Sequence, residues 1–157
     1  MRLHILAVGR LRAGSEATLV ADYLARFDRT GRPLGLGPVR VVEVEDKRGG
    51  GPAAEAGLLA AAVPAGAFLV ALDERGDQLD SPAFANLLRQ AADSGRRDLA
   101  LLIGGADGLD PTLRDRAERR LSLGRMVWPH MLARVMLAEQ LYRAASILAG
   151  SPYHRGG

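Results

Sequence analysis

Short apolar runs alternate with helix-forming stretches along the whole chain, and this alternation limits the possible folds more than any other feature. Residues 3–8, 67–72 and 99–103 are almost entirely apolar, and residues 39–44 are rich in Val. A strand that is apolar on both faces must be covered on both sides, as happens in parallel sheets. The pattern therefore predicts an α/β fold in which helices sandwich a mainly parallel sheet.

Helices are expected where apolar residues recur at helical spacing between the strands. Two helices have clear starts, because Asp80 and Asp110 each stand as a capping acceptor shortly before a first-turn proline. We expect helices at 15–28, 53–63, 81–93, 111–121 and 131–149, and a short fifth strand at 126–128. The 157 residues are expected to form a single domain, because no repeat or linker-like segment divides them.

Composition excludes several classes of protein. The chain has no Cys, which excludes disulfides, thiolate metal sites and Cys nucleophiles, and its three His residues are too scattered to predict a metal site. No apolar run reaches the roughly 18–20 residues of a membrane span, and the apolar start is too short for a secretory signal. We therefore expect a cytoplasmic protein that does not enter the membrane. Both ends are basic within a net charge of +3, which suggests a polyanionic partner such as RNA or DNA.

A glycine-rich turn is the first candidate ligand site. Gly104, Gly105 and Gly108 follow the apolar run 99–103 and precede an expected helix. Glycines let a ligand approach the backbone closely, and ligands of open α/β sheets bind at the carboxyl ends of strands. A tight strand–helix turn without a ligand explains the same spacing. The glycines fit neither G-x-G-x-x-G nor a phosphate-binding loop ending in Gly-Lys-Ser/Thr, so they indicate backbone contact with a small molecule rather than phosphate binding.

Two further segments could border the same ligand. Leu72 ends the run 67–72, and parallel strands would bring it to the same edge of the sheet as Gly104. In the segment 123–130, Met126 and Val127 could pack on an aromatic ring while their backbone groups bind its edge. Ordinary core packing would equally explain the apolar residues of this segment.

The final helix, 131–149, is apolar nearly all round. Such a helix must be covered on most sides, and a second subunit would supply that cover. Its Glu139 and Arg143 stand four residues apart, in the order that favours an ion pair. Arg143 could in addition contact phosphate.

The chain closes on a polar tail, Tyr153-His154-Arg155. His can move a proton near neutral pH, and Arg can hold a phosphate or a carboxylate. Terminal tails are most often frayed and without function, but Pro152 and Tyr153 favour a docked tail here. We therefore predict a reactive end of the chain near the ligand site.

Eight motifs occur in the order found in a known family. They are Val8-Gly9, Tyr23-Leu24-Ala25-Arg26-Phe27, Lys47-Arg48-Gly49, Ala71-Leu72-Asp73, Leu102-Ile103-Gly104-Gly105-Ala106-Asp107-Gly108-Leu109, Pro129-His130-Met131-Leu132-Ala133-Arg134-Val135, Glu139-Gln140-Leu141-Tyr142-Arg143-Ala144 and Pro152-Tyr153-His154-Arg155. With them the chain resembles the ribosomal RNA large subunit methyltransferase H family, which belongs to the SPOUT class. The resemblance spans the whole chain, and its motifs are most specific in the C-terminal half.

The resemblance implies S-adenosylmethionine as methyl donor. It implies N3 of a pseudouridine in 23S ribosomal RNA as acceptor, within the large subunit or the 70S ribosome. It also implies a homodimer and a trefoil knot in the C-terminal part of the sheet. The donor contacts that it implies are Leu72, Gly104, Gly105, Gly124, Arg125, Met126, Val127, Trp128 and Pro129.

A catalytic group follows from the chemistry of that acceptor. The imide proton on N3 must leave, which requires a group that takes or relays it. We expect His154 to be that base or relay, with Tyr153 in the same catalytic group. Arg155, Arg143 and His130 would hold RNA phosphate or stabilise the deprotonated base. A bulky residue in place of Gly105 is expected to block the donor and to leave the fold intact.

Two other functions fit the same residues. A nucleotide- or dinucleotide-binding enzyme could use the same crevice. The glycine spacing argues against this alternative, because Gly105 stands one residue earlier than the second glycine of G-x-G-x-x-G. Failure to bind NAD or ATP would exclude it. A non-catalytic RNA-binding module could have kept the fold, and it would bind RNA without binding the methyl donor.

Overall fold

The computed structural model describes residues 1–155. Five strands, five α-helices and one short 3₁₀ helix (η1) make up the regular structure of these residues. In chain order they are β1 (Arg2–Val8), α1 (Ser15–Gly31), η1 (Arg32–Leu34), β2 (Val39–Val44), α2 (Gly51–Ala62), β3 (Phe68–Asp77), α3 (Ser81–Asp93), β4 (Asp98–Ile103), α4 (Pro111–Arg114), β5 (Arg119–Leu121) and α5 (His130–Leu148). None of the helices in this part of the chain is both long and apolar enough to cross a membrane.

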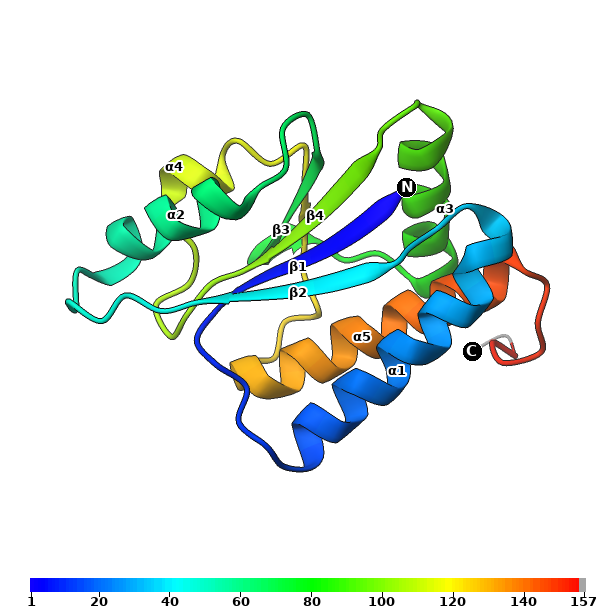
Figure 1. Ribbon diagram of the computed structural model, residues 1–157, viewed down its shortest axis with the longest axis horizontal. Helices are drawn as coiled ribbons and strands as arrows, with labels where there is room; N and C mark the ends of the chain where they lie inside the picture. The colour runs from blue at the N-terminus through cyan, green and yellow to red at the C-terminus, as the bar shows by residue number, and fades with distance from the viewer. Residues whose placement is uncertain (156–157) are drawn as a thin grey trace.

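All five strands join one parallel sheet in the order β2-β1-β4-β3-β5 (Figure 1). In its middle, Ile5 of β1 is paired with Val41 of β2 on one side and with Leu101 of β4 on the other. Parallel neighbours need crossover connections, and these carry helices to both faces of the sheet. The predicted α/β fold with a parallel sheet is therefore confirmed, while the trefoil knot stays a prediction.

Side chains along the strands alternate between two cores, one on each face of the sheet. On one face, Ile5 and Leu101 pack with residues of α1, α3 and α5 (Figure 1). On the other face, Leu6 and Leu102 pack with residues of α2 and α4. β1 and β4 are thus covered on both sides, which is why their sequences are almost continuously apolar.

The final helix, α5, packs against both α1 and α3 (Figure 1). Its stripe through Leu137, Leu141 and Ala144 is fully buried, whereas Met131 and Leu132 near its start remain exposed. The chain itself therefore covers one face of α5. The second subunit predicted as cover for the rest of the helix stays a prediction.

Two predicted elements between β4 and α5 are wrong. The helix expected at 111–121 is the single turn α4, and the strand expected at 126–128 is a loop. The fifth strand is β5, which lies at the edge of the sheet with Arg119 and Arg120 exposed. An edge strand does not need apolar side chains on both faces, so β5 lacks the sequence pattern that marks the buried strands.

β3 also continues beyond its predicted end at Leu72 as far as Asp77. Gly76 makes this possible, because an added Cβ there would lie only 2.7 Å from the carbonyl carbon of Arg120 in β5. The pairing register is irregular between Leu72 and Asp77, and both of these residues pair with Leu121. The distorted end of β3 forms one side of the candidate site.

Candidate functional site

The carboxyl ends of β3 and β4 and the loop before α5 enclose a cavity of about 180 Å³, which we call the strand-end cavity. The structure brings together here the three segments that the sequence predicts to border a ligand. Of the predicted donor contacts, those that line the cavity are Leu72, Gly104, Gly105, Gly124, Met126, Val127 and Trp128. Arg125 and Pro129 lie in the same loop, outside the lining. The role of all nine residues toward a methyl donor stays a prediction.

The glycine turn closes tightly on itself. The amide of Gly108 donates to the carbonyl of Gly105 at 3.0 Å, and an added Cβ at Gly104 would lie 2.4 Å from the carbonyl carbon of Gly108. The turn therefore requires glycine at position 104 for its own backbone packing. The tight-turn interpretation and the ligand-site interpretation of these glycines are thus both compatible with the geometry.

Gly105 lines the strand-end cavity and also lies against the core beneath α2. An added Cβ would lie 3.2 Å from Cγ1 of Val8 and 3.3 Å from Oε2 of Glu55 on α2. A bulky side chain at 105 would press on Val8, which belongs to the core beneath α2. Such a variant would therefore test packing against Val8 as well as ligand binding, and the expectation that its fold stays intact remains a prediction.

The loop between β5 and α5 presents apolar side chains to solvent. Met126 is 74% exposed and Val127 is 86% exposed. Hydrogen bonds hold the loop from inside, since Nε1 of Trp128 donates to the carbonyl of Leu123 at 3.3 Å and the amide of Gly124 donates to Oγ of Ser122 at 3.2 Å. An ordered loop with exposed apolar tips is typical of a surface that a ligand or a partner covers.

The first turns of α5 bring a buried charge to the edge of the strand-end cavity. Arg134 is 2% exposed and donates to Glu43 of β2 and, at 3.2 Å, to the carbonyl of Val8. Burial alone would raise the pKa of the Glu43 carboxyl, but hydrogen bonds from the Leu11 amide and from Arg134 outweigh it and lower the pKa. Sequence reasoning missed this pair, because 91 residues separate its members and no local spacing connects them.

His130, one turn before Arg134, lines the strand-end cavity. Its Nε2 atom is buried and has no hydrogen-bond partner among the described residues. Burial, and next the charge of Arg134, lower the pKa of the imidazole, while Glu43 opposes this shift. His130 is therefore held in its neutral form beside the cavity.

The polar tail is docked against the end of α5, as the sequence predicts. The hydroxyl of Tyr153 donates to Oε1 of Glu139 at 3.0 Å, and Nη2 of Arg143 donates to the same oxygen at 2.6 Å. The Glu139–Arg143 ion pair is thus confirmed. Nη1 of Arg143 lies 3.3 Å from Nδ1 of His154, while Arg155 is exposed.

These contacts determine the protonation of the tail. A guanidinium can only donate, so Nδ1 of His154 accepts from Arg143 and the neutral ring carries its proton on Nε2. Burial, together with the hydrogen bond to Glu139, raises the pKa of Tyr153 to about 12. Tyr153 is consequently a phenol, not a phenolate, at neutral pH.

One expectation about the tail is wrong, because a single chain does not bring it to the strand-end cavity. The cavity contacts α5 at His130 and Ala133, whereas the tail packs on Glu139 and Arg143, 6 and 10 residues after Ala133. At 1.5 Å per residue these contacts lie about 9 Å and 15 Å along the helix from Ala133. None of the described tail residues lines the strand-end cavity.

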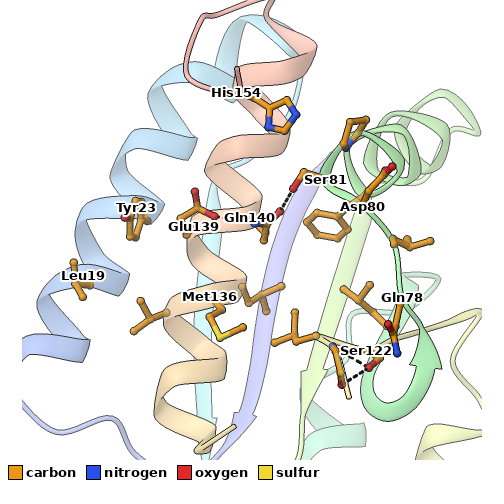
Figure 2. A pocket seen from close by; sticks show the side chains of 18 residues that line it. Leu19, Tyr23, Gln78, Asp80, Ser81, Ser122, Met136, Glu139, Gln140 and His154 are labelled. Carbon is orange, nitrogen blue, oxygen red and sulfur yellow. Dashed lines mark hydrogen bonds between the residues drawn. The ribbon is translucent and has the colours of Figure 1, made fainter. Parts of the chain in front are cut away.

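A groove of about 800 Å³ runs beside α5 between these two sites (Figure 2). Leu123 and Gly124, which also line the strand-end cavity, border the groove, and His154 lies at its opposite end from Ser122. Met136 lies between the two ends in Figure 2. We call this the α5 groove.

Comparison with known proteins agrees with this architecture. A family model described as "Predicted SPOUT methyltransferase" matches residues 1–154. Proteins named "Ribosomal RNA large subunit methyltransferase H" from Ruegeria pomeroyi and Cereibacter sphaeroides are 69% and 70% identical over 155 residues, which cover 99% of each chain. The solved structure of a probable methylase family protein from Haemophilus influenzae shares the fold with a TM-score of 0.53 at 12% identity, over 98% of this chain and 70% of that one. The chain therefore belongs to the ribosomal RNA large subunit methyltransferase H family of SPOUT methyltransferases.

Proposed function

We propose that this protein transfers a methyl group from S-adenosylmethionine to N3 of a pseudouridine in 23S ribosomal RNA, within the large subunit or the 70S ribosome. The names of its relatives support methylation of large-subunit ribosomal RNA. The observation that carries the donor assignment is the strand-end cavity, in which all three segments that the family resemblance assigns to the donor meet.

The lining of the strand-end cavity fits the adenine end of the donor. Leu72 and Leu123 offer apolar surface for a flat ring, and the nearby glycine turn offers backbone groups for its polar edge. When bound, S-adenosylmethionine supplies a methyl group that its sulfonium already activates. The residues of this chain then need to hold that methyl group in line with the acceptor and to exclude water, which is mainly a positioning effect.

The tail would act on the acceptor base. With Arg143 donating to Nδ1, His154 has an N–H at Nε2 that can donate to a carbonyl oxygen of the base. Such a bond stabilises the negative charge that develops as the N3 proton leaves. This supports a relay or stabilising role for His154 over a role as direct base. Tyr153, with its raised pKa, would likewise donate rather than accept.

The active site would combine two copies of the chain. About 15 Å of α5 separate Ala133 in the strand-end cavity from the contact of His154 with Arg143, which supports a site that joins the cavity of one protomer to the tail of another. Two further features support a homodimer: the exposed apolar tips Met126 and Val127, and the α5 groove that ends at His154. In a twofold dimer each surface would be used twice, giving two equal sites.

The test is transfer of labelled methyl from S-adenosylmethionine to assembled ribosomes, free large subunits and naked ribosomal RNA in parallel. The wild-type protein should label RNA in at least one of these samples. Ala133→Phe should abolish transfer, because Ala133 lines the strand-end cavity and a phenyl ring would fill it. The matched control is Ala61→Phe on α2, which is exposed on the opposite face of the sheet and should leave transfer unchanged.

The same assay decides between the proposal and the alternatives. RNA binding without donor binding would favour a non-catalytic RNA-binding module. Donor binding without label in any RNA would keep the cavity and contradict the RNA substrate. Equal transfer by the Ala133→Phe and Ala61→Phe variants would contradict the assignment of the strand-end cavity to the donor.

A further inference from the structure

A second cavity, of about 440 Å³, adjoins the strand-end cavity. The two share Leu72, Asp73, Glu74, Gly105 and Gly108 in their linings. Their chemistry differs, because the second cavity adds charged groups of both signs, namely Arg75, Asp107 and Arg114. We call it the polar cavity.

Asp73 stands where the two cavities meet, and one of its oxygens lacks a partner. Its side chain is 10% exposed, and Oδ1 accepts from the amide of Arg75 at 3.1 Å. Oδ2 is buried and has no hydrogen-bond partner among the described residues. The nearest cation is Nε of Arg114, at 3.7 Å. A buried carboxylate oxygen without a hydrogen bond is costly, and its presence indicates that a bound molecule supplies the donor.

The size of the strand-end cavity also indicates that a bound molecule extends into the polar cavity. At about 180 Å³ it is smaller than the roughly 300–1,000 Å³ of sites that enclose a small molecule. The adjoining polar cavity would supply the missing volume. Its paired charges suit a zwitterion, since Asp73 can accept from an ammonium group and Arg114 can donate to a carboxylate.

We propose that the polar cavity binds the amino-acid end of the methyl donor, with Asp73 accepting from its α-ammonium and Arg114 donating to its α-carboxylate. This assignment rests on the proposed function, which gives the strand-end cavity to the adenine end of the same molecule. Asp73 is then a donor-binding residue, and its orphaned oxygen has a partner in the complex.

Two stable nucleosides test the assignment by calorimetric titration. S-adenosylhomocysteine and 5′-methylthioadenosine share adenine, ribose and sulfur, and only the first carries the amino-acid end. The wild-type protein should bind S-adenosylhomocysteine more tightly. Asp73→Asn should weaken binding of S-adenosylhomocysteine about tenfold or more, the usual size of a charged hydrogen bond, and should change binding of 5′-methylthioadenosine less than about twofold.

Two further variants make the test specific. Asp115→Asn removes the same charge from the other carboxylate beside Arg114, outside both cavities, and should leave both affinities unchanged. Arg114→Gln should weaken binding of S-adenosylhomocysteine but not of 5′-methylthioadenosine. If thermal melting shows that Asp73→Asn does not fold, the Arg114→Gln variant tests whether the polar cavity binds the amino-acid end.

Each contrary result has its own meaning. Equal losses for both nucleosides in Asp73→Asn, or an unchanged affinity for S-adenosylhomocysteine, would overturn the role of Asp73. Equal wild-type affinity for the two nucleosides would overturn the polar cavity as the amino-acid site and leave the donor cavity standing. A wild-type protein that binds neither nucleoside would instead overturn the proposed function itself.

Discussion

Among single residues, Arg134 carries the most deeply buried charge of the described chain. It connects α5 to the carboxyl end of β1 through Val8, and to β2 through Glu43. Glu43 in turn accepts from the amide of Leu11, so the pair also fixes the loop that follows β1. The pair therefore ties the start of α5, beside the strand-end cavity, to two strands of the sheet.

Removing the anion of this pair should be costly. Glu43→Ala leaves the buried Arg134 charge without its counter-ion, and we expect a loss of about 2 kcal/mol in the free energy of unfolding. The loss is smaller than for a fully buried pair because the Glu43 side chain is partly exposed and Arg134 keeps its bonds to the carbonyls of Val8 and Gly9. Urea denaturation measures it. Glu45→Ala, at an exposed neighbouring position, is the control and should stay within about 0.5 kcal/mol of wild type.

His130 should give the fold a dependence on pH. Its pKa is lowered in the folded protein, so below about 6.5 the unfolded chain binds a proton that the folded chain does not. Stability must therefore fall as the pH drops from about 7 toward the lowered pKa. The free energy of unfolding should decrease more between pH 7.5 and pH 5.5 in the wild type than in His130→Gln. Identical decreases in the two proteins would show that His130 does not titrate in this way.

At the scale of elements, the sequence pattern correctly predicted the strands whose side chains are buried in the core. β1, β4 and the first part of β3 are buried on both faces, and their apolar runs identify them correctly. β5 was not predicted, because this edge strand has two exposed Arg residues and therefore lacks a continuous apolar run. The apolar segment 126–128 is an exposed loop and not the predicted strand, since a sequence does not distinguish apolar residues that are buried from those that are exposed.

Some features of the candidate site could likewise be predicted from the sequence, and others could not. The strand-end position of Leu72 and Gly104 followed from parallel topology, and the structure places both at one cavity. The pairing of Glu43 with Arg134, the orphaned oxygen of Asp73 and the direction of Gly105 depend on contacts between distant segments. Such contacts leave no local pattern in a single sequence.

Two glycine substitutions test how elements constrain each other. Gly76→Ala should destabilise the protein by about 1–3 kcal/mol, because the new Cβ would collide with the backbone of β5. Gly57→Ala in the exposed part of α2 meets no atom within 4 Å, and it should stabilise the helix by about 0.5–1 kcal/mol. Thermal or urea denaturation of both variants gives the comparison. A neutral Gly76→Ala variant would contradict the close approach of β3 and β5.

At the scale of the whole molecule, the distance between the cavity and the tail predicts complementation between defective chains. Ala133→Phe damages the cavity and His154→Ala damages the tail. If each site uses the cavity of one protomer and the tail of the other, a mixed dimer contains one site in which both parts are intact. Random re-association of equal amounts should then restore about one quarter of wild-type methyl transfer.

The control for this experiment is each variant alone, carried through the same unfolding and re-association. Each should remain at its own low activity. If both parts of a site came from the same chain, every site in the mixture would carry one defect, and the mixture would show no gain over the separate variants.

The chemical identity of the methylated product tests the proposed reaction directly. Ribosomes that have been labelled by the wild-type protein would be digested to nucleosides, and the labelled nucleoside would be identified by mass spectrometry against synthetic standards. We expect the label in N3-methylpseudouridine derived from 23S ribosomal RNA. Label on a ribose hydroxyl, on another base or on ribosomal protein would contradict it.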